Sequence, residues 1–512
     1  MEQPIRAAEV VGALSLATDL GTGQPLEHAL RTAILAVRLG ELAGASAQEL
    51  KDAYYASLLH SSGCTSDGHE TAHLFGDDIL PRAAFALVDA GRPEEVVVFL
   101  QTNVGGGRPE PERAAMVEAV LAQGLPPVQQ TFAQHCEVAQ RFAGWLGLDP
   151  GTREALGFVF ERWDGHGFPG AAGGEALPLP SRLLHVARDI SVFLSAGGPA
   201  DARAVVAGRA GTAYDPGLAE LAARRFDDLL ADLDETRIWA QALAAEPLPQ
   251  IWIAGERVDS AFAAIASFTD LKSPWLRGHS TGVAELAEAA AWRSGLAADA
   301  VTRLRRAALA HDLGRVGVSN AIWEKPGPLG FGEWERVRLH PHFTERAFAP
   351  SPALARVGAL AGSHHERCDG SGYHRGTRTP FDPEACILAA ADAYQAMREA
   401  RPYRPALDAG AAEAELQHEA REGRLDPDAV DAVLNAAGHR VPKRPREFPG
   451  GLTERELEVL LVLARGSSNQ EIGERLGISA KTVGHHVEHI YAKAGVRSRA
   501  AATLWAFEHS LV

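Results

Sequence analysis

Seven side chains of the kinds that bind transition metals recur between residues 279 and 392. They are His279, His311, Asp312, His340, His364, His365 and Asp392. A buried histidine or aspartate is costly unless it is paired, hydrogen-bonded or bound to a metal. A single histidine would be interpreted as a core residue whose hydrogen bonds are satisfied. Seven such groups in one run are hard to provide with partners unless a metal is bound. The run therefore predicts a metal centre, and its histidine-rich ligand set suits iron, manganese or zinc better than magnesium.

The spacing of neighbouring apolar residues predicts how these side chains are held. His311 follows Leu304 and Ala308 at the spacing of one face of a helix. Similar apolar faces accompany two more of the ligands: Val283, Leu286 and Ala290 with His279, and Ala385, Leu388 and Ala396 with Asp392. We therefore expect each polar group to lie in the apolar stripe of its own helix and to point into a shared interior.

Five motifs in this region closely resemble the HD-GYP family, a branch of the HD metal-dependent phosphohydrolases. They are GHSTGVAELA, AALAHDLGRVGV, EKPGPLGFGEWERVRLHPH, HHERCDGSGYHRG and AAADAYQAM, within residues 271–436. The resemblance implies an all-helical fold and cleavage of cyclic di-GMP at a site with two or three metals, usually iron or manganese. A third metal in the family uses a glutamate four residues before the first histidine. Trp275 stands there in this chain, so we expect two divalent transition metals.

The family pattern also implies a role for each ligand. The metals would be held by two sets of three residues: His279, His311 and Asp392; and His340, His364 and His365. Asp312 is adjacent to His311 and is assigned to catalysis as the bridge between the metals. A two-metal site lowers the pKa of a bridging water and clamps the phosphoryl oxygens, which overcomes the poor reactivity of water toward a phosphodiester.

Neighbouring residues depart from the family pattern or complete it. Arg315, the second catalytic candidate, stands where the family usually has lysine, so that the charge is kept while the phosphate geometry changes. Gly370 and Gly372 can bring backbone amides close to a substrate, or they simply form a tight loop. Tyr373 is expected to stack on a guanine or to hydrogen-bond it. His374 replaces the proline of the family's name-giving triplet.

The whole chain has 512 residues, which is too long for one core and predicts three or four domains. Its formal charge of −16 argues against a broadly basic nucleic-acid surface, although not against one small DNA-binding module. The four cysteines show no CxxC spacing and are expected to be reduced thiols of a cytoplasmic protein. The sequence shows no signal-peptide pattern, and no apolar run approaches the ~20 residues that span a membrane.

Residues 1–246 resemble a degenerate copy of the region 247–437. His60 comes 32 residues after His28, and the same interval separates the first two histidines of the second region. Three further features follow in the order of their counterparts: His135, the motif ERWDGHGFPG and Asp189. Ordered matches of this number favour a duplication.

The first copy has lost part of the ligand set. Ser61 stands in the place of the bridging aspartate, and Val159 and Phe160 replace the histidine doublet, so we expect no metal there. The segment between its second and third histidines is longer than its counterpart, 75 residues against 29, and predicts an inserted helical region with a loop near 103–112. This half is either regulatory, through sensing, dimerisation or packing against the active copy, or a scaffold.

Residues 452–512 are predicted to be a separate small domain, after a linker at 438–451 that is rich in proline, glycine and basic residues. Thr453 and Glu456 form a capping box at one helix start, and Ser479 caps a later helix, AKTVGHHVEHIYAKAGV. Two short helices joined by a tight turn are a helix-turn-helix. The sequence LTERELEVL, followed by GSSNQEIGERLGISAKTVGHHVEHIYAKAGVRSRAAA, resembles the LuxR-type DNA-binding domain over its whole length.

The LuxR resemblance implies that the helix after Ser479 enters the major groove of DNA. The candidate DNA contacts are Lys481 and Thr482 near phosphate, Gly484, His485 and Glu488 at the bases, and Lys493, Arg497 and Arg499 at the backbone. The domain has seven basic and seven acidic residues, and many relatives carry lysine in place of Gly484 and Glu488. Because phosphate neutralisation supplies most non-specific affinity, a monomer should bind weakly, and we expect a homodimer.

The sequence thus predicts an all-α chain with duplicated HD-GYP-like domains followed by a four-helix LuxR-type domain. The predicted function is a promoter-binding transcription regulator that carries a metal-dependent phosphodiesterase, with cyclic di-GMP as its substrate and no membrane association. Two alternatives stay open. The HD domain would sense a nucleotide without useful turnover, or it would hydrolyse another nucleotide.

Overall fold

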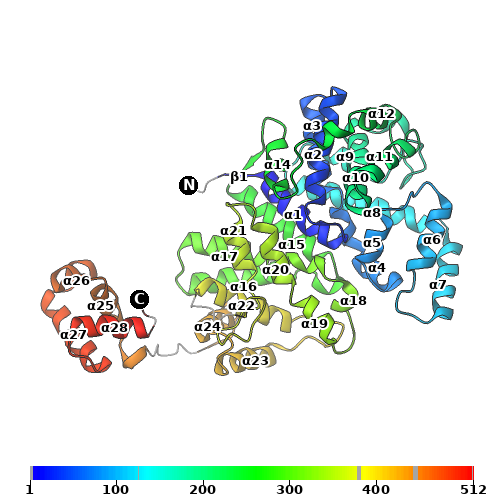
Figure 1. Cartoon of the computed structure of the whole chain (residues 1–512). Coiled ribbons are helices and arrows are strands. Elements are labelled where there is room, and N and C mark those ends of the chain that lie inside the picture. Colours follow the sequence, from blue (N-terminus) through cyan, green and yellow to red (C-terminus); the bar gives the residue numbers. More distant parts are fainter. Residues whose placement is uncertain (1–3, 125, 377–381, 442–447, 510, 512) are drawn as a thin grey trace. The chain divides into compact units, whose positions relative to one another are not determined.

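The structure is a computed structural model that describes residues 4–124, 126–376, 382–441, 448–509 and 511. The chain divides into two compact units, one that ends at His439 and one that begins at Arg440. Regular structure in the described residues is almost entirely helical (Figure 1), which confirms the predicted all-α fold. Two short strands, β1 (Ile5–Arg6) and β2 (Trp252–Ile253), pair antiparallel.

The first half of the larger unit is built on α2, α3 and α10, whose apolar faces meet in one core. Its helices are α1 (Ala7–Gly21), α2 (His28–Ala43), α3 (Ala47–Leu59), α4 (Gly68–Phe75), α5 (Leu80–Phe85), α6 (Pro93–Asn103), α7 (Glu110–Gln123), α8 (Pro126–Trp145), α9 (Pro150–Leu156), α10 (Leu179–Gly197), α11 (Pro199–Gly208), α12 (Pro216–Arg224), α13 (Phe226–Leu230) and α14 (Ile238–Ala245). Leu35, Leu183 and Ile190 are fully buried in this core. Helices α4 to α7 occupy the longer segment, and α6 and α7 form a hairpin whose connection lies inside the predicted loop (Figure 1).

The second half of the larger unit carries the predicted metal ligands. Its helices are α15 (Glu256–Asp270), α16 (His279–Arg293), α17 (Ala298–Ala310), α18 (Asn320–Trp323), α19 (Phe331–Val337), α20 (His340–Phe348), α21 (Ala355–Ala361), α22 (Pro383–Met397), α23 (Ala409–Arg421) and α24 (Pro427–Ala436). Helix α16 packs against α17, α22 and α24, and α20 packs against the short turn η4 (Leu313–Gly317). This packing brings the ends of α16, α17 and α20 to one region.

The two halves begin their histidine helices in the same way. In the first half the amide of Ala29 donates to Oδ1 of Asp19 at 3.2 Å. In the second half the amide of Ser280 donates to Oδ1 of Asp270 at 3.4 Å. In each case a buried carboxylate accepts from an amide in the first turn of a helix, where no intrahelical acceptor exists.

A second shared contact lies where a glycine meets the third histidine. A Cβ atom on Gly314 would lie 2.1 Å from the carbonyl oxygen of His340, and one on Gly63 would lie 1.9 Å from that of His135. Both distances are too short for any side chain, so the chain must have glycine at both places for the helix that follows to approach. These paired contacts support the duplication, which stays a prediction.

The smaller unit has four helices, α25 (Glu454–Ala464), α26 (Asn469–Leu476), α27 (Ala480–Ala494) and α28 (Arg499–Glu508). The predicted capping box is present, since Thr453 and Glu456 exchange hydrogen bonds between side chain and backbone amide. Gly477 ends α26 with a φ of 67°, a left-handed conformation that favours glycine. Ser479 then caps α27 through the amide of Thr482. Val459, Ile472 and Val483 are buried in the shared core, among others.

The predicted linker at 438–451 is shorter in the structure at both ends. His439 lies 2.8 Å from the hydroxyl oxygen of Tyr394 and 2.8 Å from Glu413, so it belongs to the larger unit. Phe448 packs against the core of the smaller unit, and a 3₁₀ turn follows at Pro449–Gly451. The linker between these two contacts stays a prediction. Residues 442–447 lie outside the described residues.

Candidate metal centre

The predicted metal ligands lie mostly at helix ends. His279 and His340 are the first residues of α16 and α20, and His311 directly follows the last residue of α17. Asp392 lies inside α22 with the apolar stripe that the sequence predicted. The expected helical stripe is therefore found for Asp392, whereas His311 lies where the chain leaves the helix and turns through Asp312 into η4.

The two carboxylate oxygens of Asp312 face two different pairs of histidines. Its Oδ1 atom lies 3.3 Å from Nε2 of His340 and 3.5 Å from Nε2 of His364. Its Oδ2 atom lies 3.6 Å from Nε2 of His279 and 3.5 Å from Nε2 of His311. A carboxylate in this position can bridge two cations, one on each side.

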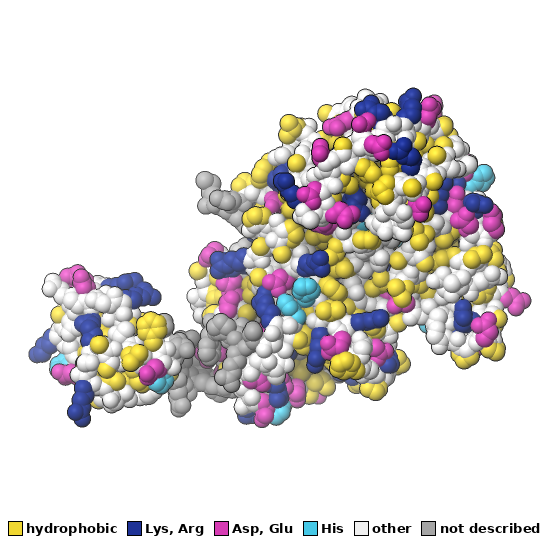
Figure 2. All heavy atoms as spheres, in the orientation of Figure 1, with side chains coloured by type: hydrophobic (Ala, Val, Ile, Leu, Met, Phe, Trp, Pro, Cys, Tyr) yellow, Lys and Arg dark blue, Asp and Glu magenta, His cyan; other side chains and the backbone are white. Residues whose placement is uncertain are grey.

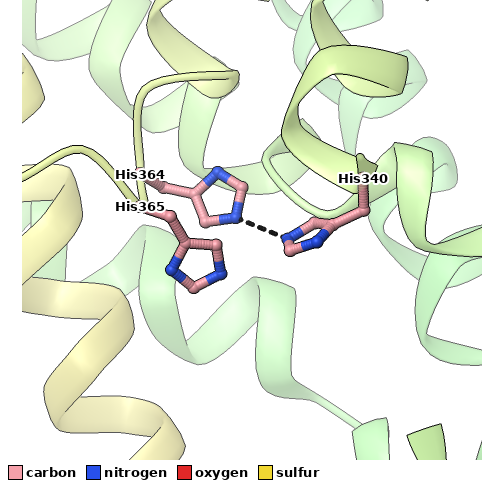
Figure 3. A group of neighbouring side chains, drawn as sticks. All are labelled: His340, His364 and His365. Carbon is pink, nitrogen blue, oxygen red and sulfur yellow. Dashed lines mark hydrogen bonds between the residues drawn. The ribbon is translucent and has the colours of Figure 1, made fainter. Parts of the chain in front are cut away.

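Asp392 and the histidine doublet complete the two sides. Oδ1 of Asp392 lies 3.4 Å from Nε2 of His279, and its Oδ2 lies 4.0 Å from Nδ1 of His365. Figure 3 shows His340 from one segment facing the adjacent His364 and His365, and the Nε2 atoms of His340 and His364 are 3.0 Å apart. Potential ligand atoms within 4.8 Å of one another occur in three groups: His340, His364 and His365; His279, His311 and Asp312; and His311, His364 and Asp392.

Backbone carbonyls fix the orientation of three imidazole rings. The Nδ1 atoms of His311, His340 and His364 lie 2.7, 2.6 and 2.7 Å from the carbonyl oxygens of Ala308, Val337 and Ala361, respectively. Each carbonyl can only accept, so each Nδ1 carries the proton and each Nε2 presents a lone pair to the interior. Metal-binding histidines are oriented by partners of this kind.

Some buried nitrogen atoms in the interior have no hydrogen-bond partner within the described part of the chain and are suited to bind metal ions. The Nε2 atoms of His279 and His311 are buried and have no hydrogen-bond partner among the described residues. Buried polar atoms are rarely left in this condition unless an ion or water satisfies them. Imidazole nitrogens together with carboxylates form a donor set that suits iron, manganese or zinc.

Burial and neighbouring charges set the pKa values of several candidate ligands. Burial alone would raise the pKa of Asp312, but Arg315 and His311 hold it well below its usual range, so the carboxylate is ionised at neutral pH. Burial lowers the pKa of His364 to about 4, which keeps this ring neutral and able to donate its lone pair. His279 differs, because burial would lower its pKa but the carboxylates of Asp392 and Glu399 raise it to about 9, so a metal that binds this ring must displace a proton.

Comparisons with known proteins agree with this geometry. Residues 264–429 match the HD domain family, and residues 451–506 match the bacterial regulatory proteins of the luxR family. The chain contains an HD domain and a LuxR-type helix-turn-helix domain. HD domains are metal-dependent phosphohydrolases.

One relative matches both halves of the larger unit. The 3'3'-cGAMP-specific phosphodiesterase 3 of Vibrio cholerae is 29% identical over 447 residues, which cover 86% of this chain and 96% of the relative. The crystal structure of the V. cholerae cyclic GMP-AMP-specific phosphodiesterase V-cGAP3 is similar with a TM-score of 0.61 and 26% identity, over 86% of this chain and 99% of that one. The cyclic di-GMP phosphodiesterase response regulator RpfG of Xanthomonas campestris is 40% identical over 144 residues, 27% of this chain and 38% of that protein.

The remaining predicted site residues of the HD domain line the same interior. The Arg315 guanidinium donates to Oδ2 of Asp312 at 2.6 Å and lies 4.0 Å above the ring of Trp323, which holds it beside the carboxylate. The ring of Tyr373 lies 4.7 Å from that of His365. Gly372 packs so closely that a Cβ atom would lie 2.5 Å from the carbonyl oxygen of His365. The loop with Gly370, whose φ is 84°, thus carries Tyr373 to the ligands.

Sequence reasoning missed Glu399, which is the partner of His279. Nδ1 of His279 lies 2.9 Å from Oε2 of Glu399, and the same oxygen accepts from Arg401 at 2.7 Å. Gln395 donates to the other oxygen at 2.8 Å. No helical spacing could have indicated it, because Glu399 lies two residues beyond Met397, the last residue of the helix that carries Asp392.

Ion pairs and aromatic rings occupy the equivalent region of the first half. Asp189, the counterpart of Asp392, is buried and accepts from Arg188 at 3.0 Å, from Arg209 at 2.7 Å and from the Tyr214 hydroxyl. Phe132 packs against Phe160 and Phe168 with ring centroids 4.7 and 4.9 Å apart, and both Phe132 and Phe160 contact the ring of His135. Among the described residues, the first half contains no group of three potential ligands close enough to hold a metal.

The predicted recognition helix α27 exposes part of the DNA-contact set. Lys481, Thr482, His485 and Glu488 are exposed on it. Gly484 is half-buried, and the nearest atom to an added Cβ would be Nδ2 of Asn469 at 4.0 Å, so a longer side chain fits there.

Three more DNA candidates lie at or beyond the end of α27. Lys493 donates to the buried carboxylate of Glu456 at 2.6 Å, and Arg499 donates to the carbonyl oxygen of Ser467, so both have partners inside the domain. Arg497 is exposed. In the view of Figure 2, basic and acidic side chains are interspersed over the larger unit, and basic side chains also lie on the smaller unit. None of the described helices is long and apolar enough to cross a bilayer.

Proposed function

We propose that the HD domain hydrolyses a phosphodiester bond of a cyclic dinucleotide at a centre of two divalent transition metals, and that the LuxR-type domain binds promoter DNA. The observation that carries the proposal is the position of Asp312, whose two oxygens face His340 and His364 on one side and His279 and His311 on the other. A site for a single ion does not need a carboxylate between two clusters of histidines.

The metals and the neighbouring side chains have different roles in the proposed reaction. Divalent metals bound there would supply hydroxide at neutral pH and neutralise charge on the phosphoryl oxygens. Arg315 is charged and already lies 2.6 Å from Asp312, so it is positioned to stabilise the negative charge that develops on a phosphoryl group. Tyr373 lies beside His365, where its ring would stack on a base and fix the orientation of the substrate. Iron or manganese is the expected metal.

We narrow the substrate to cyclic dinucleotides that contain guanine, with 3'3'-cGAMP ahead of cyclic di-GMP. The relative named for 3'3'-cGAMP matches 86% of this chain, whereas RpfG, named for cyclic di-GMP, matches 27% of it. His374 also supports a departure from the usual cyclic di-GMP enzymes, since it replaces the family's proline in the loop next to Tyr373. His374 is held there by Glu345, whose Oε2 lies 3.1 Å from its Nε2.

The proposed output is control of transcription by a dimer. The LuxR-type domain has no net charge before histidine is counted, and two of its basic candidates are engaged by Glu456 and Ser467. One copy therefore has few free charges for phosphate, and two linked copies would multiply the affinity. If nucleotide occupancy changes the DNA affinity, DNA must change the nucleotide affinity by the same factor.

A single set of purified proteins tests the proposal. Elemental analysis should give two transition metals per chain in the wild type and fewer in Asp312→Ala, and chromatography should show hydrolysis of 3'3'-cGAMP and cyclic di-GMP by the wild type but not by Asp312→Ala. His60→Gln, at the first-half counterpart of His311, is the control and should keep both metals and activity. Unchanged metal content in Asp312→Ala would refute the ligand assignment. Tight nucleotide binding without any product would favour the alternative, a sensor without turnover.

A further inference from the structure

Two of the four cysteines meet beside the metal centre. Cys368 lies in the loop three residues after His365, and Cys386 lies on α22 six residues before Asp392. Although 18 residues separate them in the sequence, both line one small cavity of about 10 Å³, together with Glu366, Ser363, Ala385, Ala389, Arg424, Leu425 and Asp426. The largest influence on the pKa of each thiol is its interaction with the other thiol. The cysteines looked scattered in the sequence, but these two form a dithiol pair.

Backbone hydrogen bonds hold the chain at both cysteines. The amide of Cys368 donates to the carbonyl oxygen of Arg424 at 2.9 Å, and that of Cys386 donates to Asp382 at 3.1 Å in the first turn of α22. The thiols are therefore brought together by fixed elements on both sides. Cys64 and Cys136 lie in the first half, on η1 (Ser62–Asp67) and α8, where burial, together with Cys64, raises the pKa of Cys136.

The two thiols differ in reactivity in a way that suits a sequential reaction. The interaction between the thiols lowers the pKa of Cys368 and raises that of Cys386. Cys368 is half-buried and Cys386 is buried. A more accessible thiol with the lower pKa is the one that attacks an oxidant first, because the thiolate is the nucleophile.

We infer that Cys368 and Cys386 form a reversible redox site whose oxidant is a peroxide. The Cys368 thiolate attacks one oxygen of hydrogen peroxide, the O–O bond breaks, and the released hydroxide takes a proton to become water, which leaves a sulfenic acid. The Cys386 sulfur then attacks the Cys368 sulfur and expels the hydroxyl group as a second water, with the thiol proton. Two thiols and one peroxide thus give one disulfide and two waters, and a dithiol reductant reverses the step.

The disulfide would join two ligand-bearing elements. One end lies on the loop that carries His364, His365 and Tyr373, and the other lies on the helix that carries Asp392. Oxidation would fix the distance between this loop and this helix. The redox state of the thiols would therefore affect the positions of the candidate metal ligands on both elements. Formation of the disulfide does not depend on hydrolysis, so the inference stands or fails independently of the proposed activity.

The test uses the full-length protein and hydrogen peroxide as the probe. After graded peroxide, remaining thiols are blocked with an alkylating reagent and the peptides are mapped without reduction. We expect a crosslinked pair of peptides containing Cys368 and Cys386, loss of two of the four free thiols, and full recovery with dithiothreitol. Cys64 and Cys136 serve as internal controls and should stay alkylated.

Two variants resolve the order of the steps. Cys386→Ser should accumulate a sulfenic acid at Cys368 that a dimedone probe captures, whereas Cys368→Ser should react slowly and give no disulfide. Circular dichroism confirms that each variant is folded. Equal oxidation of Cys64 and Cys136 in the wild type, or crosslinks only between chains, would overturn the inference.

Discussion

Nδ1 of His279 and Oε2 of Glu399 lie 2.9 Å apart, which makes Glu399 a carboxylate partner for a buried metal-ligand candidate. His311, His340 and His364 use backbone carbonyl oxygens instead. An ionised carboxylate can only accept, so Nδ1 of His279 donates to it and Nε2 is the nitrogen that faces the interior. The backbone acceptors cannot be removed by substitution, whereas Glu399 can.

Substitution of Glu399 therefore gives a direct test of the orientation of His279. We expect Glu399→Ala to weaken metal binding by about 10- to 100-fold, the usual effect of removing such a partner. Glu399→Gln should recover most of the affinity, since its amide oxygen can still accept. The measurement is metal content after dialysis against a graded chelator. Glu413→Ala is the matched control, because Glu413 pairs with His439 at 2.8 Å outside the centre, and an equal loss in that variant would contradict the prediction.

His60 predicts how stability depends on pH in the first half. Burial lowers the pKa of His60 to about 4, whereas the unfolded chain has a value near 6.5. As the pH falls from about 6.5 to about 4, the unfolded state gains a proton that the folded state does not, so the folded state loses stability in acid. Thermal unfolding of His60→Gln should show a shallower fall over this range, by up to about 1.4 kcal/mol per pH unit. Parallel curves for the two proteins would mean that His60 is not buried as a neutral ring.

The matched glycines predict which half depends on metal. A Cβ atom on Gly314 would clash with the carbonyl oxygen of His340 at 2.1 Å, and one on Gly63 would clash with that of His135 at 1.9 Å. Gly314→Ala and Gly63→Ala should each destabilise the fold by about 1–3 kcal/mol, because a packed backbone must move. Of the two, only Gly314→Ala should also lower the metal content, since it displaces a ligand candidate. Thermal melts and elemental analysis of both variants check this, and metal loss from Gly63→Ala would indicate a site in the first half.

The sequence was sufficient for features that depend on local chemistry or on matched motifs. The all-α fold was implied by the resemblance of the motifs to known families, and the capping box of Thr453 and Glu456 follows from two residue types at one interval. Long-range pairings were not predictable in this way. Lys272 is 2% exposed and donates to the buried Asp78 at 2.6 Å, which ties the inserted segment of the first half to the second half. The local sequence around Lys272 or Asp78 does not indicate that the two residues pair.

The same distinction between local features and long-range pairings applies to the candidate site. Every predicted ligand lies within reach of another ligand, because residue type and motif order carried that information. The partners of the ligands were missed where they depend on tertiary packing. In the first half, Arg209 neutralises Asp189 and the Tyr214 hydroxyl donates a hydrogen bond to it, and neither partner could be predicted from the loss of the ligand set.

Glu488 provides a test of the DNA-binding face that is independent of the metal centre. It is exposed on α27, with 78% of its side chain accessible, and lies 3.8 Å from His485. On the proposed function its negative charge repels DNA, so Glu488→Lys should raise the affinity for DNA and steepen the dependence on salt by about one to two counterions. Fluorescence titrations of one duplex at several salt concentrations measure both quantities.

The control for Glu488→Lys is the same change of charge on another helix. Glu508 is exposed at the end of α28, outside the predicted DNA contacts, and Glu508→Lys adds the same charge to the protein. A general attraction between a more basic protein and DNA would raise the affinity equally in both variants. A larger effect at Glu488 supports α27 as the element that approaches DNA, because screening at physiological salt limits the influence of a charge to about 8 Å. Equal effects would remove the support for α27 as the recognition helix.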